Sequence, residues 1–233
     1  MRVFSSHRML ILGWLGSLLG FFALALRASS GHILGADVQV SEAVQDLPAF
    51  LDYLFRFENW LGDGTPFALL TIASALVFFT AKHTLEATMI MLSFAFRLAN
   101  VLVKVVVAEP RPIADVIRVT YPHDNLSYTS GHVLGVTLVC TMLILFIPKL
   151  NWPRYLVVGV ESLCIVYICS IGLARIWVGA HWPSDVLGAY LFSLVLLIPI
   201  VVLCRRWLLG DSEPGSRPSG SKRFRRCSLR RHV

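Results

Sequence analysis

Four long stretches without a charged residue limit the possible folds of this chain more than any other feature of its sequence. A helix that crosses a lipid bilayer needs about 20 mostly apolar residues, or about 17 at the short end. Two more stretches are apolar but contain charged residues, among them Arg97, Lys104 and Glu161. The six stretches are residues 9–26, 65–81, 85–107, 133–147, 155–173 and 186–204. The sequence therefore predicts an all-α integral membrane protein, a bundle of six transmembrane helices.

The composition supports this class and argues against a soluble protein. Apolar residues make up 56% of the 233 residues and charged residues 15%, whereas soluble domains carry roughly 25% charged residues. Much of the net charge of +7 comes from the C-terminal tail, so we expect that end to face a membrane surface and not a nucleic acid. The five cysteines show no zinc-binding spacing. We expect neither a disulfide framework nor a bound metal or other cofactor.

Basic residues in the short loops predict the orientation of the helices, because cytoplasmic loops are enriched in Lys and Arg. The more basic side carries Arg2, Arg8, Lys82, Lys149, Arg154, Arg205 and Arg206. We therefore expect a multi-pass protein of the inner or plasma membrane with both termini in the cytoplasm. The membrane domain is predicted over residues 1–209, and a disordered basic tail over residues 210–233.

The first outer loop, residues 27–64, contains an amphipathic segment at residues 44–61. Its apolar residues recur at helical spacing: Val44, Leu47, Leu51, Leu54, Phe55 and Trp60. The pattern predicts an amphipathic helix or helices in this loop, which either lie at the membrane interface or pack on the bundle as a cap, and the sequence favours neither position. Prolines in the second outer loop, residues 108–129, argue against a long helix there. In that loop we expect His123 and Asp124 to be solvated.

Three groups of polar residues gather at the outer ends of the predicted helices, where ionisable groups are costly and usually functional. In chain order they are Lys104 with Arg111, then Ser130 with Gly131 and His132, then Arg175 with His181 and Asp185. Each group alone is a weak signal. The predicted topology, however, brings all three to one face of the membrane.

These residue types suit the binding and transfer of a phosphate group. The three cations can hold phosphate, and Arg does so with two parallel hydrogen bonds. Ser130 and Gly131 precede a predicted helix, whose free N–H groups and dipole favour an anion. The two histidines suit a nucleophile and an acid–base group near neutral pH. Asp185, four residues after His181, can reach the imidazole and fix its tautomer.

Together these residues resemble the three-part signature of the type-2 phosphatidic acid phosphatase (lipid phosphate phosphatase) superfamily. The first part is Lys-x6-Arg-Pro at residues 104–112, the second Tyr-Thr-Ser-Gly-His at 128–132, and the third Arg-x5-His-x3-Asp at 175–185. Two positions depart from the family pattern, because Thr129 replaces the usual Pro and Ala174 the usual Ser. We expect the first change to loosen the entry to the fourth helix and the second to remove a supporting hydrogen bond.

The resemblance implies a metal-independent phosphatase that acts on a lipid phosphate through a phosphohistidine. It implies that His181 is the nucleophile, that His132 protonates the leaving oxygen, and that Asp185 orients His181. The residues that hold the phosphate are then Lys104, Arg111, Ser130, Gly131 and Arg175. The predicted topology puts this site on the outer or luminal face of the membrane.

Several alternatives remain open from the sequence. The motifs bind the phosphate and not the lipid tail, so the substrate is a glycerolipid phosphate, such as phosphatidic acid or phosphatidylglycerophosphate, or a polyprenyl diphosphate. The same chemistry suits a lipid phosphotransferase, and a catalytically silent scaffold or transporter is the alternative outside enzymes. On the third predicted helix, Asn100 shares a face with Lys104, and we expect it to orient that lysine. Arg97 needs a buried partner, for which Glu161 is a candidate.

Overall fold

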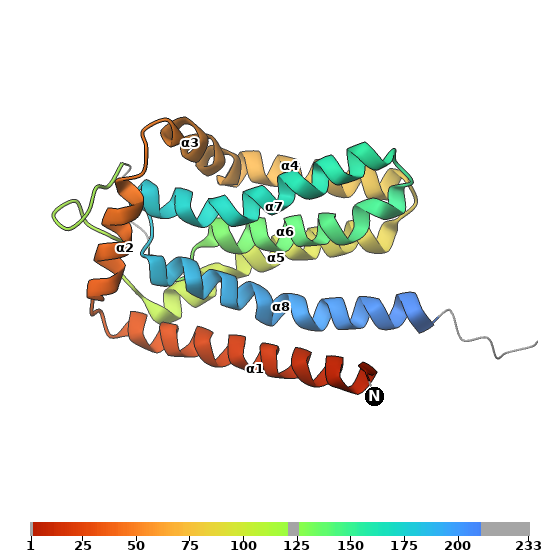
Figure 1. Ribbon diagram of the computed structural model, residues 1–233, viewed down its shortest axis with the longest axis horizontal. Coiled ribbons are helices and arrows are strands. Elements are labelled where there is room, and N and C mark those ends of the chain that lie inside the picture. The colour runs from red at the N-terminus through yellow and green to blue at the C-terminus, as the bar shows by residue number, and fades with distance from the viewer. Residues whose placement is uncertain (1, 121–125, 211–233) are drawn as a thin grey trace, which may run out of the picture. The chain divides into compact units, whose positions relative to one another are not determined.

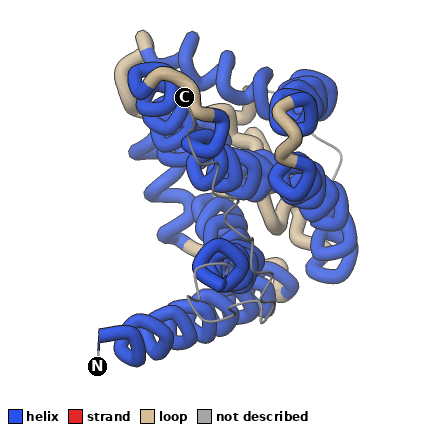
Figure 2. The backbone as a smooth tube through the Cα atoms, turned by 90° about the vertical axis from the view of Figure 1, so that its right-hand side faces the viewer, coloured by secondary structure: helices blue, strands red, loops and turns tan. Residues whose placement is uncertain are grey.

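The computed structural model describes residues 2–120 and 126–210, and every regular element in these ranges is a helix (Figures 1 and 2). In chain order they are α1 Arg2–Ser29, α2 Gly35–Gln45, α3 Leu51–Gly62, α4 Gly64–Thr80, α5 Thr84–Val107, α6 Gly131–Phe146, the 3-10 helix η1 Ile147–Leu150, α7 Arg154–Trp177 and α8 Pro183–Gly210. The chain divides into two compact units, residues 1–198 and 199–233. In the second unit, the described residues continue α8 to Gly210.

Two predictions fall on parts of the chain outside the described residues. The basic tail predicted at 210–233 is described only at its first residue, which ends α8, so its disorder stays a prediction. His123 and Asp124 lie in the stretch 121–125, which is outside the described residues as well.

Helix α6 is the central helix of the first unit. It packs against both α5 and α7, and 61% of its apolar span is buried, compared with 11–28% for the other four long apolar helices. Eight consecutive residues, 133–140, are buried, as expected for a helix that is apolar on all sides. The first turn of α6 is therefore held in the interior of the protein, where its N–H groups point out of the end of the helix.

The segment that leads into α6 is anchored to α1. Tyr128 has no exposed surface, and its hydroxyl donates a hydrogen bond to the Phe21 carbonyl oxygen at 2.8 Å. Phe21 in turn stacks on Phe192 of α8, with ring centroids 4.7 Å apart. These contacts tie α1 and α8 to the residue that lies two positions before Ser130.

The prediction of an all-α membrane bundle is confirmed. Five helices of the described chain are long and apolar enough to cross a membrane, and the number rises to six if α3 and α4 are counted as one bent span. Helix α4 has only 17 residues, and it meets α3 at an angle of 69°. The break between these two helices falls at Asp63.

The amphipathic segment predicted at 44–61 is divided between two helices, in agreement with the expected helix or helices in the first outer loop. Helix α2 ends at Gln45 and α3 begins at Leu51, with Pro48 in the connection between them, where its missing N–H is tolerated. Helix α3 packs on α7 through Phe55, which is 3% exposed. Its other face carries exposed aromatic residues, among them Tyr53, which is 84% exposed.

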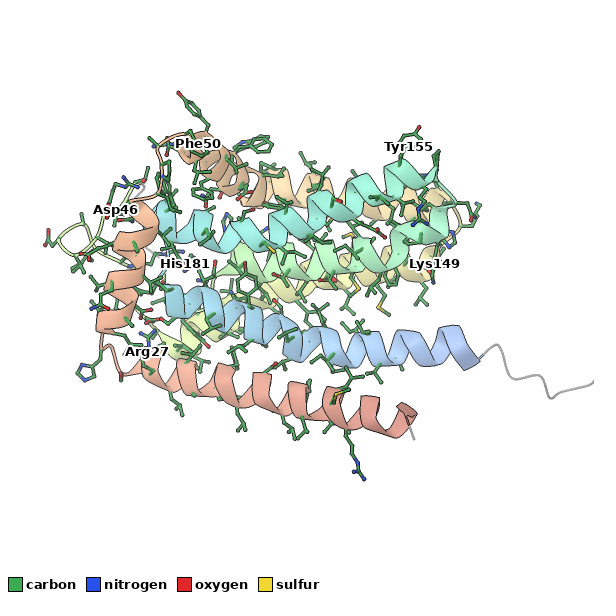
Figure 3. The ribbon with its side chains drawn as sticks, viewed as in Figure 1. Arg27, Asp46, Phe50, Lys149, Tyr155 and His181 are labelled. Carbon is green, nitrogen blue, oxygen red and sulfur yellow. The ribbon has the colours of Figure 1, made fainter. Side chains whose placement is uncertain are left out.

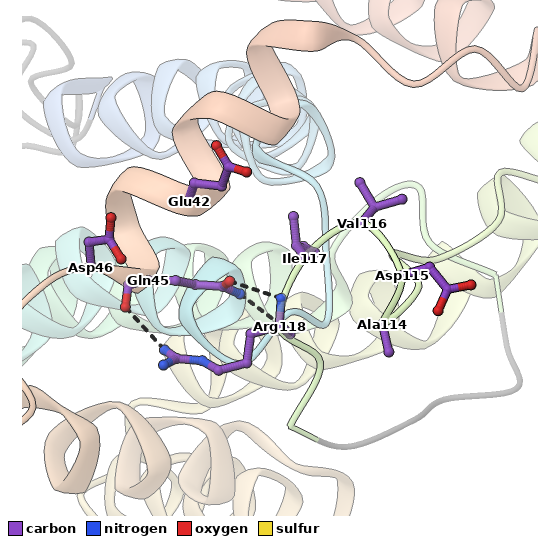
Figure 4. Close-up of a pocket in the computed structure, with 8 residues that line it drawn as sticks. All are labelled: Glu42, Gln45, Asp46, Ala114, Asp115, Val116, Ile117 and Arg118. Atoms are coloured by element: carbon purple, nitrogen blue, oxygen red, sulfur yellow. Dashed lines mark hydrogen bonds between the residues drawn. The ribbon is translucent and has the colours of Figure 1, made fainter.

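The loop between α5 and α6 is held against α2 and the end of α7. The Gln45 side chain donates a hydrogen bond to the Arg118 carbonyl oxygen at 2.8 Å and accepts one from the Arg118 N–H at 3.1 Å (Figure 4). A cavity of about 490 Å³ lies beside this link, between α2 and residues 114–118. The Thr120 N–H donates to the Val178 carbonyl oxygen at 2.9 Å. The loop therefore packs directly on the turn between α7 and α8.

Gly179 lies in that turn and allows the close packing of the loop. Its φ is +69°, and a Cβ atom at this position would collide with the carbonyl oxygen of Arg118. Gly31 has a similar φ of +71° but no heavy atom within 4 Å of the same position. Alanine substitutions at the two glycines can therefore be compared. The Gly31 variant reports the free-energy cost of the backbone conformation alone, and the Gly179 variant adds the cost of the collision.

We expect Gly179→Ala to lower the free energy of unfolding by about 2–4 kcal/mol, because backbone strain and overpacking add. Gly31→Ala should lower it by about 1 kcal/mol, from the left-handed conformation alone. Thermal unfolding of both variants, purified in detergent, measures the difference. Equal losses would show that the loop does not pack tightly on Gly179.

Candidate functional site

Four helix ends and the loop between α5 and α6 come together in the first unit. They are the C-terminal ends of α5 and α7 and the N-terminal ends of α6 and α8. Figure 3 shows His181 at this end of the helices and Lys149 and Tyr155 at the opposite end. Electrostatic interactions connect His181 with four other predicted site residues: Lys104, Arg111, Arg175 and His132. The three groups that are separate in the sequence therefore form one cluster.

His181 is 1% exposed, and its two ring nitrogens face different partners. Its Nδ1 atom lies 3.5 Å from Asp185 Oδ2 and 3.3 Å from Ser127 Oγ. Asp185 Oδ2 also accepts hydrogen bonds from the Ser127 hydroxyl and from the Trp182 N–H, the latter at 2.9 Å. A carboxylate on this side favours the tautomer with its proton on Nδ1. The lone pair of Nε2 is then available on the other side of the ring.

A cation lies on the Nε2 side of His181. Arg111 Nη1 is 3.4 Å from His181 Nε2 and donates a hydrogen bond to the Ala180 carbonyl oxygen at 2.5 Å. Burial lowers the pKa of His181 well below its usual value, and the positive charges of Lys104 and Arg111 add to this effect. His181 is therefore a neutral imidazole at neutral pH, which is the form that can act as a nucleophile.

Ser130 is the N-cap residue of α6, yet its side chain makes no capping hydrogen bond. It has no exposed surface, and its Oγ atom has no hydrogen-bond partner. An N-cap serine normally accepts a hydrogen bond from the first turn, and an unpaired buried hydroxyl costs about 1–3 kcal/mol. Together with the free N–H groups that begin at Gly131, this hydroxyl is suited to bind an anion.

The other two cations are held by neutral partners. Lys104 Nζ donates to the carbonyl oxygens of Leu126 and Ser127 at 2.8 and 2.7 Å. Arg175 Nη1 donates to Asn59 Oδ1 at 2.6 Å, while Arg175 Nε is buried without a partner. Within the described ranges, neither cation lies within 4.0 Å of a carboxylate oxygen. Buried positive charge without a counter-charge is unfavourable, so this cluster favours an anionic ligand.

His132, in the first turn of α6, pairs with a residue from the break between α3 and α4. Its Nε2 atom lies 3.0 Å from Asp63 Oδ1, and the Asp63 side chain is 60% exposed. Gly62 permits this approach, because a Cβ atom there would lie 2.5 Å from His132 Cδ2. The Asp63 carboxylate accepts the Nε2 proton in this pair, which leaves Nδ1 as the ring nitrogen that can exchange a proton with a bound ligand.

The expectation that Asn100 orients Lys104 is wrong. Asn100 Nδ2 donates to the Thr129 carbonyl oxygen at 3.0 Å, and its Oδ1 accepts from the Thr129 hydroxyl at 2.7 Å. Thr129 therefore forms two bonds to α5 that a proline, which has no hydroxyl, could form only in part. These two bonds fasten the entry of α6 to α5, and a looser entry than with proline stays a prediction.

Arg97 does not pair with Glu161. Its Nη2 donates to the Gly62 carbonyl oxygen at 2.7 Å, and its guanidinium lies 4.3 Å from the centroid of the Phe67 ring. Arg97 thus holds the break between α3 and α4 against α5 by a hydrogen bond and a cation–π contact. It supports the segment that carries Asp63.

Among the residues that contact the site, Asn59, Asp63 and Ser127 were not predicted from the sequence. Asn59 is 116 residues from Arg175, and Asp63 is 69 residues from His132. Nothing in the local sequence connects these pairs, because Gly62-Asp63-Gly64 indicates only a turn. Ser127 directly precedes the second signature segment, and that position was the one available signal.

Comparison with known proteins gives a family and two relatives in sequence. The model of the PAP2 superfamily matches residues 83–208, which contain all eight predicted site residues. The undecaprenyl-diphosphatase BcrC of Bacillus subtilis is 29% identical over 117 residues, or 49% of this chain and 54% of the relative. An undecaprenyl-diphosphatase of Sulfolobus acidocaldarius is 29% identical over 138 residues, or 56% and 60% of the two chains. The chain thus matches little more than half the length of these relatives.

One solved structure shares the fold. It is the crystal structure of a transmembrane PAP2-type phosphatidylglycerolphosphate phosphatase from Bacillus subtilis, with a TM-score of 0.65. The match covers 82% of this chain and 96% of that chain, at 21% sequence identity. The likeness shows the fold of a transmembrane protein, and with the apolar helices it establishes an integral membrane protein.

Ser130 allows a test of the anion site that separates binding from folding. Because Ser130 Oγ is buried without a partner, Ser130→Ala should not lower the melting temperature of the free protein, and loss of the unpaired hydroxyl should raise it. The affinity of this variant for inorganic phosphate should fall about tenfold, the value of one hydrogen bond to a charged group. The shift of the melting temperature with phosphate concentration measures this affinity.

Ser193→Ala is the matched control, because Ser193 is equally buried but donates to the Ala189 carbonyl oxygen at 2.8 Å. This variant should keep the phosphate affinity of the unaltered protein. Unchanged affinity in Ser130→Ala would contradict the assignment of Ser130 to the anion site.

Proposed function

Because the chain belongs to the PAP2 superfamily, we propose that it is a metal-independent membrane phosphatase that hydrolyses a lipid phosphate or prenyl diphosphate through a phosphohistidine on His181. The main support for this proposal is the set of contacts around His181. Its Nε2 lies 3.4 Å from Arg111 Nη1, and its Nδ1 lies 3.5 Å from Asp185 Oδ2. A nucleophile, an orienting carboxylate and a phosphate-binding cation are thus in contact with one another.

In the first half-reaction, the phosphoryl group moves from the lipid to His181. Nε2 attacks phosphorus in line, the P–O bond to the lipid breaks, and its electron pair stays on the lipid oxygen. That oxygen takes the Nδ1 proton of a doubly protonated His132, which acts as the general acid, while Nε2 keeps the proton that faces Asp63. Asp185 stabilises the positive charge that develops on the His181 ring, and Asp63 supports His132 in the same way.

In the second half-reaction, water replaces the histidine. A water molecule gives a proton to His132 and attacks phosphorus, and the P–N bond breaks with its electron pair on Nε2. Inorganic phosphate leaves, and both histidines return to their starting states. His132 therefore acts first as an acid and then as a base.

The protein itself supplies the charge that stabilises the transferred phosphate. Phosphoryl transfer depends mainly on positioning and on stabilisation of charge. Lys104, Arg111 and Arg175 provide three cations, and Ser130 with the N–H groups from Gly131 provides further donors. Such groups can act without magnesium, which is the basis for proposing a reaction without a metal.

The proposed orientation puts this site at the outer or luminal face, with both termini in the cytoplasm. Basic residues of the short loops support it, because Lys149 lies at the opposite end of the helices from His181 (Figure 3). The lipid then presents its phosphate from the outer leaflet. The names of the relatives supply two substrate classes, a polyprenyl diphosphate and phosphatidylglycerolphosphate.

The proposed function is tested by phosphate release from a panel of both substrate classes and phosphatidic acid, in detergent with excess EDTA. We expect the unaltered protein to release phosphate from at least one of them, and His181→Ala to lower kcat at least about 10³-fold. His83→Ala is the control, because His83 borders α5 next to Glu86 and should keep full activity. Near-normal release by His181→Ala would contradict the nucleophile, and strict dependence on added magnesium would contradict the metal-free reaction.

Asp63 gives a test of the acid–base role of His132. We expect Asp63→Asn to lower kcat about tenfold, because it removes a carboxylate that supports a group worth about 10²–10⁴ in rate. In a His132→Ala background the same change should have no further effect, since Asp63 acts through His132. Asp52→Asn is the control, because Asp52 pairs with Arg56 at 2.7 Å. Additive losses in the double variant would exclude this role.

A further inference from the structure

Two carboxyl groups meet behind the His181–Asp185 pair. Asp185 has no exposed surface and Glu109 is 3% exposed. The two side chains lie within interaction distance, and the negative charge of Asp185 acts on Glu109. Asp185 Oδ2 is occupied by Ser127 and Trp182, and Glu109 Oε1 accepts from Arg27 Nη1 at 2.6 Å. The remaining oxygens, Asp185 Oδ1 and Glu109 Oε2, are both buried and have no donor.

A contact between these two oxygens requires a proton. Ionised carboxylates only accept hydrogen bonds, whereas a protonated carboxyl group donates one. Two buried carboxylates in contact repel each other, and one of them then holds a proton at neutral pH. One proton between Glu109 Oε2 and Asp185 Oδ1 satisfies both unpaired oxygens.

The surrounding charges decide which of the two groups keeps the proton. Asp185 receives two hydrogen bonds on Oδ2 and faces the ring of His181. The other titratable groups that interact with Glu109 include Arg27 of α1, Asp37 of α2, Lys104 of α5 and Tyr128 of the loop before α6. Arg27 is shared, because its Nη2 lies 3.3 Å from Asp37 Oδ2. Asp185 is therefore the group that carries the negative charge, and Glu109 is the group that keeps the proton.

We propose that Glu109 stays protonated in the folded protein and donates its carboxyl proton to Asp185 Oδ1, which makes it a positioning residue for the His181–Asp185 pair. This inference rests on the proposed function of that pair. The neutral carboxyl group holds Asp185 in the rotamer that faces His181 without adding a second negative charge. Glu109 lies between Lys104 and Arg111 in the chain, so the first signature segment contributes to both sides of His181.

The proposal predicts a dependence of stability on pH. Burial raises the pKa of Glu109 to about 9, the hydrogen bond with Asp185 and its negative charge add to this effect, and Arg27 opposes it. Between the usual value of 4.5 and about 9, the folded protein holds a proton that the unfolded chain has released. Stability therefore falls as the pH rises through this window.

The test compares Glu109→Gln with Glu109→Ala. Glutamine keeps a neutral donor for Asp185 Oδ1 and an acceptor for Arg27, so kcat at pH 7 should stay within about threefold of the unaltered protein. Alanine leaves Asp185 Oδ1 unpaired and should lower kcat about tenfold. The fall in melting temperature between pH 5 and 9, and the loss of activity as the pH rises through about 9, should be absent in Glu109→Gln. Its infrared spectrum should lack one carbonyl band of a protonated carboxylic acid.

Glu86→Gln is the matched control, because Glu86 is a buried glutamate that pairs with a cation, Lys149, at 2.6 Å. It should keep both the alkaline loss and the infrared band. Equal loss of activity in Glu109→Gln and Glu109→Ala, or an unchanged band in Glu109→Gln, would overturn the proposal. The band and the melting temperatures do not depend on turnover, so they test Glu109 even if His181→Ala disproves the phosphohistidine.

Discussion

Asp185 is a charged group buried at the start of α8, and much of the surrounding structure serves to hold it there. An ionised carboxylate without partners in the interior would cost many kcal/mol. The protein supplies donors from two segments, the Ser127 hydroxyl and the Trp182 N–H. The backbone of Ser127 is fixed in turn, because its N–H donates to the Glu109 carbonyl oxygen at 2.8 Å and its carbonyl oxygen accepts from Lys104. The loop between α5 and α6 is thus organised around one carboxylate.

Buried polar groups of α1 and α2 also find their partners within the protein. Lipid provides no hydrogen bonds, so polar groups near the bilayer must find partners within the protein. Arg27 at the end of α1 pairs with Asp37 of α2 and with Glu109, and it donates to the Ser184 hydroxyl. Asp37 also accepts from the Ser184 N–H at 2.9 Å, next to Asp185 in the chain. Residues far from the phosphate-binding groups therefore fix the first turn of α8.

Much of the fold could be predicted from the sequence, because the pattern of apolar runs reports directly on which segments can lie in lipid. The connections were less predictable. The division of residues 44–61 into α2 and α3 depends on packing against α7, which local periodicity does not report. Thr129 was expected to loosen the chain, yet it bonds to Asn100, a partner 29 residues away on α5.

Some residues of the candidate site could be predicted from the sequence, and others could be identified only in the structure. The sequence by itself determined a membrane-embedded helical protein and predicted eight candidate residues for a phosphate site, because these lie in short segments with regular spacing. Only the tertiary structure decided what orients them: Asn59 beside Arg175, Asp63 beside His132, and Ser127 and Glu109 beside Asp185. These partners come from other helices and loops, and a polar group selects its partner by distance in space. The spacing of residues along the chain predicts where helices begin and end, but it does not predict which helices pack against each other.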